Sequence, residues 1–169
     1  MHYNSVLVHL ALIKGIGPVS IKTIIQQIGP TNLHEIYTLT LSDFINRCGL
    51  SRAISSLIVQ GLLQKELLEN EQDLIAKHEI HTITILDSGY PALLKEIYVP
   101  PIVLYGMGDV SLLSNKSIAV IGSRQAGQYA QRVIDAWVPL LIQTGWVIVS
   151  GGALGADAMA HQAGPEGSR

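Results

Sequence analysis

Two glycine-rich turns, each at the end of a short apolar run, most constrain what this chain can fold into. The apolar runs are residues 118–121 and 146–149, and the turns that follow begin at Gly122 and Ser150. Apolar runs that end in glycine are typical of strands buried on both faces of a parallel sheet. Residues 128–143 between them have helical spacing, so the pattern predicts a βαβ unit. Its turns would meet at the carboxyl edge of the sheet, where backbone N–H groups can receive phosphate.

The predicted crossover helix, residues 128–143, has two further features. Its apolar residues form one stripe, made of Tyr129, Val133, Trp137 and Leu140. Pro139 lies inside the helix and lacks the N–H of an ordinary helical residue, so we expect it to kink or shorten the helix.

Residues 1–66 are predicted to form a small all-helical domain of the SAM-like or helix-hairpin-helix-like type. Two stretches with helical spacing flank residues 14–18, and Pro18 is placed to open the second helix. A weaker second copy surrounds residues 48–51, with Ser51 as an N-cap. The first turn predicts a secondary phosphate contact, while a plain helical bundle with a tight glycine turn fits equally well. The residues of that contact would be Lys14, Gly15, Gly17 and Lys22.

The remaining segments complete the predicted organisation. Residues 67–79 are rich in charge and are predicted to form a linking helix with a solvated face. Residues 80–163 are predicted to be the N-terminal part of a Rossmann-like domain, with strands at 81–86 and 102–106 around a short helix. Residues 164–169 have the composition of a linker or cloning tail. A doubly wound sheet needs further strands, so we expect the chain to be truncated.

Composition limits the function classes. The formal net charge of −2 argues against a strongly basic nucleic-acid binder, so a bound polyanion would need a local patch and backbone donors. Cys48 is the single cysteine, which excludes a disulfide framework, favours the cytoplasm and suggests a buried apolar side chain. The histidines lack metal-ligand spacing, so no metal or cofactor is predicted. Residues 136–156 carry no charge, but their proline and glycines argue against a membrane span.

The two turns predict an anion-binding site. In the first turn, glycine permits close approach, the serine offers a hydroxyl and the arginine offers a planar fork for two phosphate oxygens. The alternative is a purely structural role, as a tight turn with a capping serine and a solvated arginine. Asp157 and His161 are four residues apart on the last predicted helix, where a structural role is favoured over catalysis. The predicted nucleic-acid-binding residues are Gly122, Ser123, Arg124, Gln125, Gly151, Gly152 and Gly155.

Three ordered blocks resemble the DNA-processing protein A family, also called DprA or Smf. They are residues 90–108, from Tyr90-Pro91 to Gly108, then residues 118–124, then residues 150–161. The resemblance covers about residues 80–163, and a helical N-terminal domain is usual in the family. Ser-Gly-Gly-Ala-Leu-Gly-Ala-Asp stands where the family more often has Ser-Gly-Leu-Ala-x-Gly-Ile-Asp.

The resemblance implies an extended Rossmann-like domain that binds single-stranded DNA and helps load the RecA recombinase during natural transformation, without catalysis. The family's DNA-contacting motif falls on Gly122, Ser123 and Arg124. The resemblance also implies a homodimer in the full-length protein, with the surfaces for dimerisation and RecA contact beyond the end of this chain. The alternative is a nucleotide-binding or nucleoside-monophosphate-hydrolysing protein of the lysine-decarboxylase-like type. That type uses a Pro-Gly-Gly-x-Gly-Thr-x-x-Glu loop, which does not occur in these residues.

Overall fold

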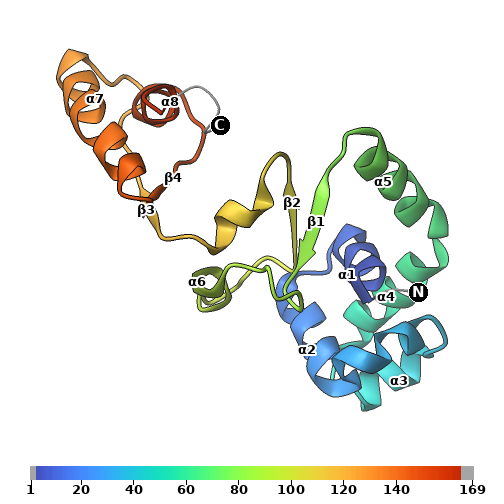
Figure 1. Cartoon of the computed structure of the whole chain (residues 1–169). Helices are drawn as coiled ribbons and strands as arrows, with labels where there is room; N and C mark the ends of the chain where they lie inside the picture. The colour runs from blue at the N-terminus through green and yellow to red at the C-terminus, as the bar shows by residue number, and fades with distance from the viewer. Residues whose placement is uncertain (1–2, 165–169) are drawn as a thin grey trace. The chain divides into compact units, whose positions relative to one another are not determined.

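The computed structural model describes residues 3–164, which divide into two compact units between Val110 and Ser111 (Figure 1). The first unit is mainly helical and the second contains the βαβ unit. The elements of the first unit are α1 (Tyr3–Leu12), α2 (Pro18–Ile28), the 3-10 helix η1 (Pro30–Tyr37), α3 (Leu41–Asn46), α4 (Arg52–Leu63), α5 (Lys65–Lys77), β1 (His81–Thr84), α6 (Ala92–Lys95) and β2 (Val103–Gly106). Then follow η2 (Val110–Ser114), β3 (Ser117–Ala119), α7 (Gln128–Gln143), β4 (Val147–Val149) and α8 (Ala156–Gln162).

The helices of the first unit form where the apolar spacing predicts them. On α2, every residue of the predicted stripe is buried, and Pro18 occupies the first helical position after the N-cap Gly17. Ser51 caps α4 as expected, because its hydroxyl accepts the backbone N–H of Ile54 at 3.3 Å. Cys48 is buried, which confirms that expectation. The stripe residues of α2 are Ile21, Ile24, Ile25 and Ile28.

The sequence analysis missed η1. Its two buried side chains, Leu33 and Ile36, are three residues apart, which is the repeat of a 3-10 helix and gives only one pair in eight residues. Pro30 therefore ends one helix and also begins the next element.

The strands β1 and β2 belong to the first unit and pair antiparallel, from His81 opposite Gly106 to Thr84 opposite Val103. The sequence predicts that these residues lie in the Rossmann-like part. Within the first unit, polar side chains connect them to α1. The Thr84 hydroxyl donates to Asn4 Oδ1 at 3.1 Å, and the Asn4 amide donates to Asp87 at 3.4 Å. Thr84 is fully buried at this junction.

The predicted linking helix corresponds to α5, which packs along α1 within the first unit. Leu68 is buried, and the Gln72 amide donates to the Ser5 hydroxyl at 3.3 Å. Most of the charged residues are exposed, as the sequence indicates, but Glu71 is half-buried and its carboxylate hydrogen-bonds Tyr105 of β2. The compact units therefore divide at residue 110, whereas the predicted domain limits were residues 66, 79 and 163.

The second unit contains the predicted βαβ unit. The strands β3 and β4 pair parallel, with Ile118 opposite Ile148, and α7 crosses between them over residues 128–143. Ile134 and Val138 of α7 pack with Ala156 and Ala160 of α8 in a small core. The prediction of strands buried on both faces is wrong for this unit. All three residues of β3 are exposed. The sheet has only two strands among the described residues of this unit, and the buried core lies between α7 and α8.

The structure adds which side of α7 is covered. The stripe of Tyr129, Val133, Trp137 and Leu140 faces solvent, with Tyr129 77% and Trp137 63% exposed, and the core side is formed by Ile134 and Val138. Of the two effects expected of Pro139, shortening is wrong, since the helix extends from Gln128 to Gln143, and a kink stays a prediction.

His9 is buried in the first unit, where its Nδ1 lies 3.0 Å from the Tyr37 hydroxyl. Its Nε2 is buried and has no hydrogen-bond partner in the part of the chain that the structure describes. Burial lowers the pKa of His9 below its usual 6.5, although the nearby backbone of Gln64 and Gly61 opposes this. The neutral imidazole is therefore the form that the fold favours.

We predict that the contribution of His9 to the free energy of unfolding is constant well above pH 6.5 and falls as the pH is lowered through 6.5 towards the lower folded-state pKa of His9. The sign follows because the unfolded chain binds a proton on His9 at a higher pH than the folded chain does. Urea denaturation between pH 7.5 and 5 should show that His9→Gln removes the part of the fall in stability that is due to His9. The exposed control His34→Gln should keep it, and an unchanged slope in His9→Gln would contradict the assignment.

We predict that Gly61→Ala destabilises the first unit. A methyl group on Gly61 would lie 2.6 Å from the side chain of Ile13, which is itself buried. Overpacking of about 1–3 kcal/mol should outweigh the roughly 1 kcal/mol that alanine gains inside a helix. Chemical denaturation measures the difference. Gly89→Ala, where a methyl group meets open space, is the control and should change stability little.

Candidate nucleic-acid interface

The two glycine-rich turns are in direct contact in the second unit. The backbone N–H of Ala156 donates to the Ser123 carbonyl at 3.1 Å. Gly155 packs so closely on the first turn that a methyl group there would lie 2.3 Å from the Ser123 carbonyl oxygen and 2.6 Å from Arg124. A methyl group on Gly122 would lie 2.6 Å from Ala156 Cβ. The parallel pairing of β3 and β4 thus brings both turns to one edge, as the βαβ pattern predicts.

Not every predicted backbone donor is available to a ligand. The N–H of Ala153 donates to Asp157 Oδ2 at 3.4 Å, and the N–H of Gln125 donates to the Ser123 hydroxyl at 3.0 Å. The first turn also directs the carbonyls of Ser123 and Arg124 towards Gly155. The backbone donors that remain for a phosphate at this edge are therefore those without an internal acceptor.

Two side chains at this edge carry polar groups that make no ion pair or hydrogen bond within the described residues and so are suited to a ligand. Arg124 is exposed, and within residues 3–164 its guanidinium makes no ion pair. The Ser150 hydroxyl, at the end of β4, is buried without a hydrogen-bond partner among the residues that the structure describes. Ser150 begins the second glycine-rich turn but is not among the residues predicted to bind nucleic acid. Its position directly after the strand was the only signal.

Asp157 and His161 do not form the pair that their spacing allows. Asp157 is 7% exposed and its carboxylate turns back to the second turn, while His161 is exposed. The structural interpretation of Asp157 is the one that the contacts favour.

The predicted secondary contact lies in the other compact unit, between α1 and α2. Gly15 has φ +90°, and a methyl group there would lie 3.2 Å from Leu57 of α4. Lys14 is exposed and Lys22 half-buried, one on each side of the turn. A tight turn joins the two helices as the spacing predicts, and its contact with nucleic acid stays a prediction.

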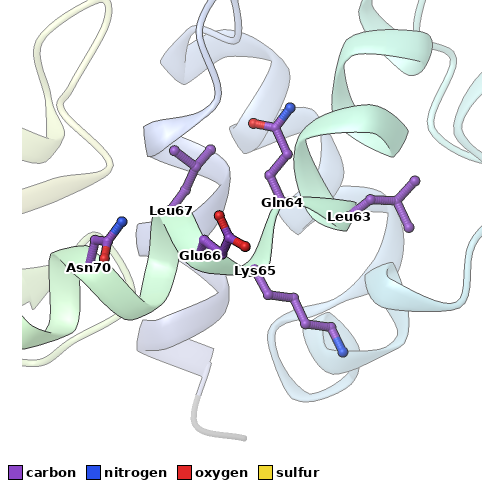
Figure 2. Close-up of a pocket in the computed structure, with 6 residues that line it drawn as sticks. All are labelled: Leu63, Gln64, Lys65, Glu66, Leu67 and Asn70. Carbon is purple, nitrogen blue, oxygen red and sulfur yellow. The ribbon is translucent and has the colours of Figure 1, made fainter.

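A hollow of about 430 Å³ lies where α4 meets α5, lined by six residues. Figure 2 shows Gln64 and Lys65 pointing to opposite sides of the chain, with Leu63 directed away from both. These side chains do not converge on a ligand, so this hollow is a weaker candidate. The lining residues are Leu63, Gln64, Lys65, Glu66, Leu67 and Asn70.

Two further hollows, of about 320 and 210 Å³, lie among the described residues of the first unit. Between residues 3 and 164, no group of three or more His, Cys, Asp or Glu side chains is placed to hold a metal ion. None of the helices there is long and apolar enough to cross a membrane.

Comparison with known proteins decides the family. Residues 81–168 match the family model of DNA recombination-mediator protein A, which is more than half of the chain. The chain belongs to this family. The match includes both glycine-rich turns, so the family assignment and the predicted site rest on the same segment.

Individual relatives agree with this assignment. The chain is 44% identical over 85 residues to DNA processing protein DprA of Bacillus subtilis, a match that covers 50% of this chain and 29% of that protein. It is 30% identical over 156 residues to protein Smf of Synechocystis, covering 88% of this chain and 38% of the relative. The chain thus spans about a third of the length of these curated relatives.

The fold matches a solved member of the family. The X-ray structure of DNA processing protein A (DprA) from Streptococcus pneumoniae superposes with a TM-score of 0.73 at 25% identity. The match covers 94% of this chain and 53% of the other. It confirms the predicted fold class, a helical N-terminal part followed by a partial Rossmann-like region.

We predict that Gly155→Ala separates the two turns and destabilises the second unit. The new methyl group would collide with backbone atoms of Ser123 and Arg124 at a residue with φ +80°, so a loss of about 2 kcal/mol or more is expected. Urea denaturation followed by Trp137 and Trp146 fluorescence reports on this unit. The control Gly127→Ala, where a methyl group meets open space, should lose less than about 1 kcal/mol.

Proposed function

We propose that this chain binds single-stranded DNA through its sugar-phosphate backbone at the joined turns of the second unit. The observation that carries the proposal is the contact between Gly155 and the turn at residues 122–124, which brings two glycine-rich loops and one exposed arginine to a single edge. Glycines without side chains allow a phosphate to approach the main chain, and the planar guanidinium of Arg124 can pair two phosphate oxygens.

The Ser150 hydroxyl at the end of β4 is buried without a partner among the described residues, which costs about 1–3 kcal/mol. A shift of the second turn on DNA binding would let this hydroxyl donate to a phosphate oxygen. With a net charge of −2, the chain has no overall attraction for a polyanion, so binding depends on this local patch. Contacts of this kind do not read bases, and we expect little sequence preference.

The wider role follows from the family. We propose that the full-length protein mediates recombination in natural transformation by handing single-stranded DNA to the RecA recombinase, in the cytoplasm, as a homodimer and without catalysis of its own. The support is the family name and its relatives, DNA processing protein DprA and protein Smf. The helical turn with Lys14, Gly15, Gly17 and Lys22 would add a second, weaker phosphate contact.

We predict that Arg124→Ala weakens binding of fluorescein-labelled oligo-dT by about tenfold. The loss of one phosphate contact should also lower the slope of log affinity against log salt concentration by about 0.7. Fluorescence anisotropy at several salt concentrations measures both quantities.

Arg52→Ala is the matched control, since Arg52 is exposed on α4 in the first unit. It should bind as the unmodified chain does. Equal affinity of Arg124→Ala and the unmodified chain would reject the proposed site.

A further inference from the structure

We infer that Asp157 is a positioning residue, whose buried carboxylate holds the glycine-rich turn at residues 151–153 in its DNA-binding shape. This inference rests on the proposed function and concerns the same edge of the second unit. A carboxylate repels phosphate, so its role beside a phosphate site is to hold the main chain and not to contact the ligand.

The contacts of Asp157 are directed at the backbone of the turn. Its Oδ2 accepts the N–H of Ala153 at 3.4 Å. A methyl group on Gly151 would lie 3.1 Å from the same oxygen, so the main chain at Gly151 passes directly over the carboxylate. Between these two contacts lies Gly152 with φ +68°, a left-handed conformation that glycine adopts without a steric penalty.

Burial separates this role from that of a surface charge. Asp157 is 7% exposed and lies in the first turn of α8, next to Ala156, whose N–H bonds to Ser123. The carboxylate is therefore fixed relative to both glycine-rich turns. It holds one of them directly and lies beside the residue that anchors the other.

Charge and geometry make opposite predictions for substitutions here. If the carboxylate acted only through its charge, both Asp157→Asn and Asp157→Ala would bind DNA more tightly, because a negative group near the phosphates is lost. If it positions the turn, only Asp157→Asn can still accept the Ala153 N–H, since its amide oxygen replaces Oδ2 in a side chain of the same size.

The test uses the whole 169-residue chain and labelled oligo-dT at several salt concentrations. We expect Asp157→Ala to lose about tenfold in affinity with an unchanged salt slope, and Asp157→Asn to bind within about threefold of the unmodified chain. Equal or tighter binding by Asp157→Ala, or a loss in Asp157→Asn as large as that in Asp157→Ala, would overturn the inference.

Amide hydrogen exchange at Ala153 in the free chain provides a readout that does not involve DNA. We expect protection in the unmodified chain and in Asp157→Asn, and faster exchange at this amide in Asp157→Ala while the amides of α7 stay protected. The same exchange in all three chains would contradict the inference. If the unmodified chain fails to bind oligo-dT, the proposed function fails, and the exchange data still decide whether Asp157 holds the turn.

Discussion

The close packing of Gly155 against the main chain of residues 123–124 is the constraint on which the second unit depends. It joins the loop after β3 to the loop after β4 without any side chain at the point of contact, and the bond from Ala156 to the Ser123 carbonyl completes it. The parallel pairing of the strands brings the two loops near each other, and the absence of a Cβ at Gly155 lets them meet. Arg124 is exposed beside this contact, and its guanidinium makes the same region a candidate site for an anionic ligand.

The first unit depends on buried apolar residues with a few polar attachments. Its core is formed by regularly spaced aliphatic side chains from α1, α2, η1, α3 and α4, with Phe44 at full burial. The Asn4, Thr84 and Asp87 contacts fix the antiparallel hairpin to α1. These interactions explain why residues 81–106 fold with the helices, although they lie within the segment that matches the family model.

The sequence predicted local structure better than burial. The spacing of Ile21, Ile24, Ile25 and Ile28 defines α2, and the limits of α7 agree with the predicted crossover helix, because local periodicity decides both. Which side of α7 is covered depends on the elements packed against it, so the spacing of Tyr129 and Trp137 does not show that their side of the helix is exposed. Similarly, the glycines of the two turns predicted the candidate site from sequence. The spacing could not show that the Asp157 carboxylate accepts the amide of Ala153 or that the Ser123 hydroxyl accepts the amide of Gln125, because both depend on side-chain directions.

A site made chiefly of main chain has a particular tolerance for change. At Leu154 the side chain is 77% exposed, so many residue types would fit there without disturbing the outline of the turn. At Gly122 and Gly155 there is no room for even one added carbon. Evolutionary drift in such a protein should therefore be confined to the tips of the loops, and two homologues could share a binding surface while having few surface side chains in common.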